Sequence, residues 1–294
     1  MGIWTKKLLS LSLDGASLKL LACRGGKVSA WSITPFNPRF LKGGFIANPE
    51  GLAQVIKAAL SKKELGGQRR VIASLPAFHS VSRPLAIPGS PELRPDVAIP
   101  QQARREMGYS PESSLLFWQP LGTMGGKRRY LVLSVPKEPV ITLIDTLKLA
   151  GLKPDKIETS SFALARAVNQ TQSIIAAVEP NSLDVVITDD CLPVAIQSTF
   201  FGEEPMGIDA LPSLLTDALE RIITFYNDTR PVNPLSGDTP LYLFGSLLSA
   251  SEIASAVETS LGHPISDFQP PLLYPPDFPR AEMAINIGLV LKEL

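Results

Sequence analysis

The residue types that carry out most protein chemistry are sparse in this sequence and do not cluster. Among 294 residues there are two cysteines, Cys23 and Cys191, and two histidines, His79 and His263. Their spacing matches no metal-ligand motif, and no hydrolase motif surrounds either histidine. Cys23 lies in an apolar run, where a cysteine usually acts as a small buried hydrophobe. The residues therefore indicate no metal site, and we assign no catalytic residue.

Composition limits the classes of partner. Lysine plus arginine and aspartate plus glutamate are equal at 28 each, so the formal net charge is zero. A nucleic-acid binder would need a basic stripe with interleaved aromatic residues, and the basic residues here occur only as short local runs. No apolar run is long enough to span a bilayer, and the start lacks a signal-peptide core. We expect a cytoplasmic protein that reaches the inner face of the membrane only through a partner.

Two stretches of the chain have the same predicted order of elements: three strands, a helix and a further strand. The first comprises strands Lys7–Leu13, Leu18–Arg24 and Lys27–Thr34, a helix starting at Pro49 behind an Asn48 cap, and strand Val71–Leu75. The second comprises strands Ser173–Val178, Leu183–Thr188 and Leu192–Thr199, a helix capped by Asp209, and strand Leu241–Phe244. A repeated order of elements predicts two related lobes of α/β structure.

An extra segment lies between the two series. It contains a predicted helix at Pro100–Met107, a strand at Tyr130–Val135 and a helix ending near Gly151, and Ser160–Val168 follows as a helix of the first lobe. We expect a first lobe over 1–81, an inserted subdomain over 82–158, a first-lobe helix within 159–172, a second lobe over 173–279, and a helix within 280–294 that returns to the first lobe.

Several segments resemble the FtsA/PilM type of the actin-like ATPase superfamily, whose PilM members act in type IV pilus assembly. They are Val71–Pro76 continuing into Arg83–Pro88, the stretch Tyr130–Pro136, Ala150–Leu152 followed by Phe162–Ala167, and the ending Ala284–Leu289. The resemblance covers essentially the whole chain, through the order and spacing of these segments. It implies a duplicated actin-like (ribonuclease H-like) two-lobed fold with an inserted subdomain.

In many relatives the fold binds ATP with magnesium between two hairpin turns, and this resemblance implies a nucleotide site formed by Asp14, Gly15, Ala16, Ser17, Lys19, Gly245 and Ser246. The first turn keeps an acid, a glycine and a hydroxyl, but Ala16 replaces a second small residue. In the second turn Glu179 stands where relatives have aspartate, and Pro180 has no N–H to donate. We therefore expect a degenerate site with at most weak ATPase activity. An active ATPase whose nucleotide state switches partner binding is the alternative.

The resemblance also implies a partner, the N-terminal cytoplasmic segment of a PilN-like bitopic membrane protein. An extended peptide could combine backbone hydrogen bonds with apolar pockets, and Arg83, Phe117 and Trp118 are the candidate contacts. The apolar neighbours Leu115 and Leu116 favour a second interpretation, in which both aromatic residues are core of the inserted subdomain. A homodimer, and a competence or secretion system in place of a pilus, are left open.

Other classes on this fold have less support. A sugar or acetate kinase would need intact phosphate turns and a catalytic acid, and neither can be assigned. A division protein of the FtsA type would carry a basic amphipathic anchor, and Lys292-Glu293-Leu294 follows the last predicted helix directly.

Overall fold

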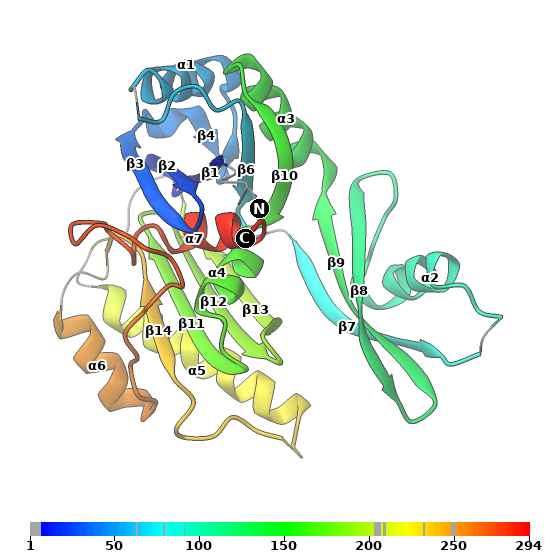
Figure 1. Ribbon diagram of the computed structural model, residues 1–294. Coiled ribbons are helices and arrows are strands. Elements are labelled where there is room, and N and C mark those ends of the chain that lie inside the picture. Colours follow the sequence, from blue (N-terminus) through cyan, green and yellow to red (C-terminus); the bar gives the residue numbers. More distant parts are fainter. Residues whose placement is uncertain are drawn as a thin grey trace, which may run out of the picture. The chain divides into compact units, whose positions relative to one another are not determined.

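The computed structural model describes residues 7–62, 64–78, 80–90, 92–202, 207, 210–231, 233–247 and 251–294. The chain divides into two compact units (Figure 1). One consists of Met1–Ala77 with Thr142–Leu294, and the other of Phe78–Ile141. Each is described by itself.

The larger unit contains two sheets with the same strand order and direction. In the first, β1 pairs antiparallel with β2, β2 antiparallel with β3, and β1 parallel with β6; β10 is added beside β6. In the second, β11, β12 and β13 form the same antiparallel series, and β14 pairs parallel with β11. The predicted duplication and fold class are therefore confirmed. The first-sheet strands are β1 (Lys7–Leu13), β2 (Ser17–Arg24), β3 (Lys27–Pro35), β6 (Arg70–Leu75) and β10 (Lys153–Thr159), and the second-sheet strands are β11 (Gln172–Glu179), β12 (Ser182–Asp189), β13 (Leu192–Phe200) and β14 (Leu241–Phe244).

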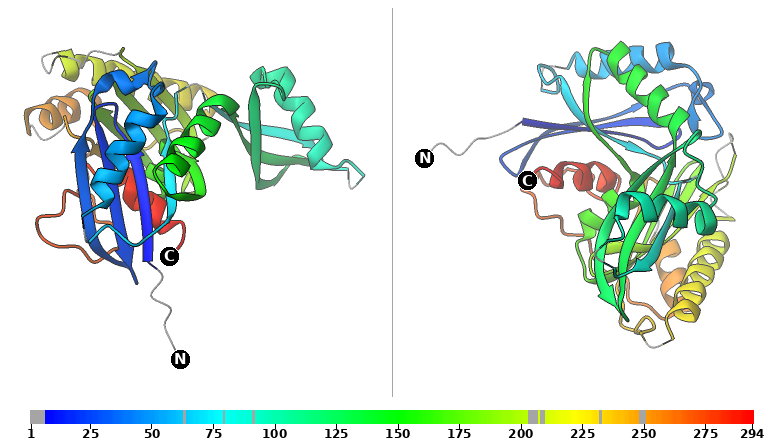
Figure 2. Two further views of the ribbon diagram at one scale, coloured as in Figure 1. Left: turned by 90° about the horizontal axis from the view of Figure 1, so that it is seen from above. Right: turned by 90° about the vertical axis from the view of Figure 1, so that its right-hand side faces the viewer.

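Helices cover both outer faces of the larger unit. Helix α1 (Pro49–Leu60) begins as expected, with the Asn48 side chain accepting from the N–H of Gly51 at 2.9 Å, and α3 (Lys137–Leu149) lies beside it (Figure 2). Helix α5 (Leu211–Thr229) packs on the second sheet and against α6 (Ser251–Leu261). The expected cap of α5, Asp209, lies outside the described residues. Between β3 and α1 the chain forms the short elements η1 (Pro38–Phe40), β4 (Leu41–Lys42) and β5 (Phe45–Ile46).

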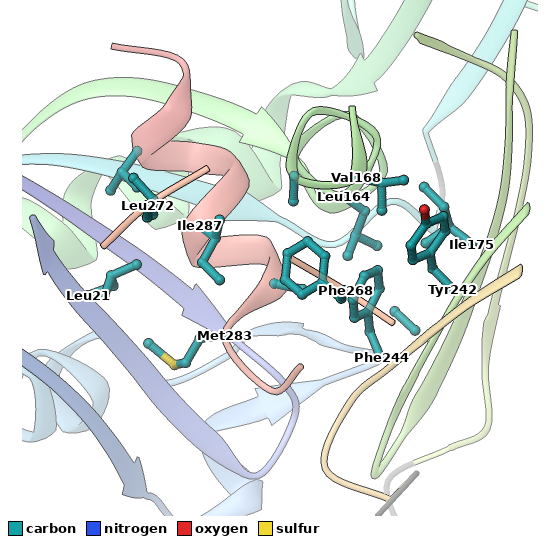
Figure 3. Packing of buried hydrophobic residues seen from close by; sticks show 14 of the residues in the cluster. Leu21, Leu164, Val168, Ile175, Tyr242, Phe244, Phe268, Leu272, Met283 and Ile287 are labelled. Atoms are coloured by element: carbon teal, nitrogen blue, oxygen red, sulfur yellow. The ribbon is translucent and has the colours of Figure 1, made fainter. Parts of the chain in front are cut away.

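A layer of two helices separates the sheets. Helix α4 (Ser160–Val168) contacts β12 and β13, helix α7 (Ala284–Leu291) contacts β1, β2 and β6, and the two helices pack on each other. They cross closely, because a Cβ added at Gly288 would lie 1.8 Å from the carbonyl oxygen of Ala163. The surrounding core draws on both sheets (Figure 3): Leu21 and Met283 lie toward the first, and Ile175 and Phe244 toward the second. The last helix thus returns to the first sheet.

The smaller unit is a three-stranded antiparallel sheet with one helix. Its strands, in the order β7-β9-β8, are β7 (Val81–Pro88), β9 (Lys127–Pro136) and β8 (Ser114–Met124). Helix α2 (Pro95–Met107) packs on β7 and β9. Its core includes Leu85, Ile99 and Val132.

Two details of this region differ from the sequence prediction. Helix α2 starts at Pro95 rather than Pro100, so Pro100 lies inside it. The compact unit ends at Ile141, whereas the predicted insertion continued to 158. The difference arises from β10, a polar strand that pairs parallel with β6 and so belongs to the first sheet.

Candidate functional site

The turn after β1 brings together five of the seven predicted nucleotide residues. Asp14 accepts hydrogen bonds through Oδ1 from the N–H groups of Ala16 (3.0 Å) and Ser17 (2.5 Å), and Gly15 supplies the positive φ of 90° that the turn requires. The two N–H groups best placed to meet an anion are therefore already bound to the carboxylate of the chain itself. A phosphate could reach them only if Asp14 turned away.

Lys19 joins this turn to the equivalent turn of the second lobe. Its Nζ lies 3.1 Å from Asp14 Oδ2 and 2.9 Å from Glu179 Oε1, and the Lys19 side chain is 2% exposed. Burial alone would lower the pKa of Lys19, but attraction by Glu179 and Asp14 outweighs it and raises that pKa. Lys19 is therefore a buried cation held between two carboxylates, one from each lobe.

The cluster contains more carboxylate than Lys19 can neutralise. Burial raises the pKa of Glu179 to about 7, against the attraction of Lys19, and neighbouring Asp14 and Asp184 raise it further. Burial also raises the pKa of Asp184, although Asp184 Oδ2 accepts a 2.6 Å hydrogen bond from Ser160 Oγ. Glu179 Oε2 is buried and has no hydrogen-bond partner among the described residues. One proton or one further cation would relieve this excess of negative charge.

The second turn lies directly against the first. It is a two-residue hairpin of Pro180 and Asn181 between β11 and β12. A Cβ added at Gly15 would be 3.1 Å from Asn181 Oδ1, so the two turns are in contact. Asn181 is held there because its Nδ2 donates to the carbonyl of Gly202 at 3.0 Å. Pro180 has no N–H, so this turn offers fewer donors than a phosphate-binding hairpin would need.

The remaining predicted nucleotide residues, Gly245 and Ser246, follow β14. Gly245 is buried with φ 111°, and a Cβ there would lie 1.9 Å from the carbonyl oxygen of Val178. The lack of a side chain at Gly245 is thus required by the neighbouring strand β11. A larger side chain at Gly245 would collide with the backbone of β11.

Two functional residues of this region were not predicted, although each is a polar residue within an otherwise apolar stretch of sequence. Asp184 is an acid inside the apolar strand β12, and Asn286 is the polar residue of the strongly apolar helix α7. Asn286 Oδ1 accepts from Ser12 Oγ at 2.6 Å, and its Nδ2 donates to the Lys19 carbonyl at 3.1 Å. A single polar residue in a buried apolar element usually has a specific partner, and here Asn286 fixes the backbone that carries Lys19.

The predicted partner residues lie in the smaller unit on opposite faces of its sheet. Arg83 and Trp118 both pair with Val132, so they share one cross-strand row on the face that α2 packs against. Phe117 pairs with Leu133 and points to the other face. Phe117 is 54% exposed and Trp118 36% exposed. The interpretation that these aromatics are core is therefore wrong, because β8 is an edge strand.

A cavity of about 250 Å³ lies elsewhere in the larger unit. It is lined by the first residues of β1 and β6 and by Asp155, which pairs with Arg70 at 2.5 Å. Asp14 follows the opposite end of β1, so this cavity is separate from the Lys19 cluster. In the described part of the chain no helix is long and apolar enough to cross a membrane, and no group of three or more acidic, histidine or cysteine side chains is arranged to hold a metal ion.

The sequence matches no protein-family model and no curated protein sequence. Solved structures show the fold. A chain of the PilM-PilN type IV pilus biogenesis complex superposes with a TM-score of 0.79 at 20% identity over 98% of both chains. The cytoplasmic domain of EpsL, an inner membrane component of the type II secretion system of Vibrio cholerae, gives 0.55 at 14% identity, covering 97% of this chain and 95% of that one. MreB5 of Spiroplasma citri bound to ADP gives 0.52 at 10% identity, covering 98% and 96%. The chain has the actin-like ATPase fold.

Proposed function

We propose that this protein is an actin-like scaffold of type IV pilus assembly or a related secretion system, and that it binds the cytoplasmic N-terminal segment of a PilN-like membrane protein. The observation that carries the proposal is the similarity to the PilM–PilN structure, which extends over 98% of both chains at a TM-score of 0.79. The actin-like MreB5 covers as much of the chain but reaches only 0.52. On this proposal the protein is cytoplasmic and reaches the membrane through its partner.

The proposed role does not require ATP, and the geometry of the two turns supports a degenerate nucleotide site. The N–H donors of the first turn bind Asp14, Lys19 bridges the acids of both lobes, and Asn181 lies against Gly15. The groups that would receive phosphate and magnesium thus bind each other, and the residues present do not fit a phosphate between the turns in this arrangement. An active ATPase remains the competing hypothesis, because an acid, a lysine and a second acid are all present.

Fluorescence anisotropy tests partner binding, with a labelled peptide that corresponds to the N-terminal segment of a PilN-like protein. We expect saturable binding to the parent chain and about tenfold weaker binding to Arg83→Ala, which corresponds to about 1.4 kcal/mol. Arg105→Ala is the matched control, since Arg105 is an exposed arginine of α2 in the same unit. Failure of the parent chain to bind would remove the scaffold proposal, and equal binding by Arg83→Ala would remove Arg83 from the contact.

Nucleotide binding is tested by isothermal titration with magnesium-ATP and by a turnover assay. We expect weak or absent binding and no turnover. Submicromolar binding with multiple turnovers would establish the ATPase hypothesis, and Asp14→Ala should then abolish the binding.

A further inference from the structure

The free edge of β8 is a second feature of the smaller unit, independent of the proposed function. β8 is the terminal strand of the sheet, and its residues from Phe117 to Pro120 are all exposed. None of its eleven residues is charged, and three large apolar side chains are exposed there: Phe117, Trp118 and Met124. Proteins normally protect such an edge with charge, proline or a covering element, because its unpaired N–H and C=O groups template another strand.

The two edges of this sheet are protected differently. The opposite edge, β7, carries Pro84 near its middle and Arg83 beside it. In β8 the stretch from Ser114 to Gln119 has neither proline nor charge, and Pro120 comes only after it. The first half of β8 therefore has the features of an edge that is covered by a partner.

The charge of the sheet indicates what that partner is. Strands β7, β8 and β9 contain four basic residues, Arg83, Lys127, Arg128 and Arg129, and no acidic residue. Arg128 is engaged within the unit, where it donates to the carbonyl of Ser90 at 3.1 Å. The three strands thus offer positive charge and apolar side chains to a strand added beside β8, and none of the three carries a carboxylate.

Arg129 is placed to reach the free edge. It lies on β9 opposite Gly122 of β8, on the same face as Phe117. Gly122 has no side chain to stand in the way, and Arg129 Nη1 lies 3.7 Å from the Sδ of Met124, a β8 residue. This face of the edge therefore offers a cation at Arg129, and the opposite face offers an apolar contact at Trp118.

We propose that the free edge of β8 binds an extended segment of alternating apolar and acidic residues from another protein, which adds to the sheet as a fourth strand. Backbone hydrogen bonds to β8 provide the pairing. Successive side chains of the added strand point to opposite faces, so its apolar side chains contact Trp118, and its carboxylates lie on the face of Phe117 and Arg129, where Arg129 pairs with one of them. A second copy of this chain is a poorer occupant, because it would bring a second wholly basic sheet alongside the first.

The test uses two labelled peptides, each about eight residues long and capped at both ends: one alternates valine with glutamate and the other valine with lysine. With the full chain we expect a Kd of about 100 µM for the glutamate peptide, and binding of the lysine peptide at least about tenfold weaker. Phe117→Glu should weaken glutamate-peptide binding about tenfold, whereas Phe117→Lys should keep or strengthen it. Arg129→Gln should weaken it several-fold.

Phe117 is half exposed, so the two Phe117 variants should keep the circular dichroism spectrum and melting temperature of the parent, which separates lost binding from lost folding. Equal affinity for both peptides, or equal loss of binding in both Phe117 variants, overturns the proposal. So does sedimentation that shows a dimer of this chain which both Phe117 variants dissociate, because a second copy is then the occupant. The PilN-like peptide takes no part in these measurements, so failure here leaves the scaffold proposal standing.

Discussion

Replacement of Glu179 by glutamine tests whether the buried charge cluster holds more negative charge than Lys19 can balance. Burial raises the pKa of Glu179 from 4.5 to about 7. An acid whose pKa is higher in the folded state binds its proton more tightly there, so folding is favoured at low pH and stability is lost as pH rises from 4.5 through 7. The rise corresponds to about 3 kcal/mol, and most of it falls between about pH 5 and pH 8. Glu179→Gln should remove this part of the pH dependence.

The assay is urea unfolding of parent and variant at about pH 5 and about pH 8, with the fall in unfolding free energy between the two pH values as the measured quantity. Glu64→Gln is the control, because Glu64 is an exposed glutamate of the same unit. It should leave the fall unchanged. Asp184→Asn added to Glu179→Gln should reduce the fall further, since burial raises the pKa of Asp184 as well. If Glu179→Gln shows the same fall as the parent, Glu179 does not titrate in this range, and Lys19 keeps it ionised.

Three further substitutions probe the contacts that hold the larger unit together. Lys19→Met should lower the unfolding free energy by about 3–5 kcal/mol near neutral pH, because it leaves buried carboxylates without their cation; denaturant titration measures this, and a loss below about 1 kcal/mol would contradict it. Gly245→Ala should give insoluble or strongly destabilised protein through collision with the Val178 carbonyl, and soluble expression with a parental melting temperature would show that β14 can shift. Gly288→Ala should lower the melting temperature by about 10 °C or more, as expected for several kcal/mol of lost packing where α7 meets Ala163; a shift of only a few degrees would mean that the helices separate easily.

The duplicated core was predictable because its elements carry their own local signals. Helix α4 spans Ser160–Val168, as predicted, and α1 starts behind its Asn48 cap. The buried strands β11 and β14 contain continuous apolar runs. Each of these elements is specified by residues adjacent in sequence, so periodicity and capping suffice to locate them.

Besides the two-residue strands β4 and β5, three strands were not predicted, and all three lie at sheet edges. β7 is interrupted by Pro84, β8 contains Pro120 and Gly122, and β10 is largely polar over Lys153–Thr159. An edge strand is hydrogen-bonded to one neighbouring strand only and is partly exposed. Its sequence therefore need not show the apolar alternation or the continuous apolar run by which a strand is predicted. The exposure of Phe117 follows from the same fact: its apolar neighbours indicated a core position, but among the described residues no strand lies beyond β8.

The candidate site was predictable only within the first turn. Asp14, Ala16 and Ser17 interact over three residues, and the sequence shows that turn directly. The contact between Lys19 and Glu179 joins residues 160 positions apart, and nothing local to either residue indicates the other. The equivalence of the two lobes made Glu179 a candidate site residue. It did not indicate that Glu179 binds Lys19 rather than a ligand.

The place of α7 in the central layer has a consequence for how the protein is made. The ribosome synthesises β1, β2 and β6 in the first quarter of the chain, yet the inner face of their sheet is covered by α7, which is made after every other element. Until α7 emerges, the apolar face around Leu21 lacks Met283 and Ile287, and Ser12 lacks Asn286. The first lobe therefore completes its core only when synthesis has passed residue 291, and a chain stopped before α7 would present an open apolar sheet to chaperones and proteases.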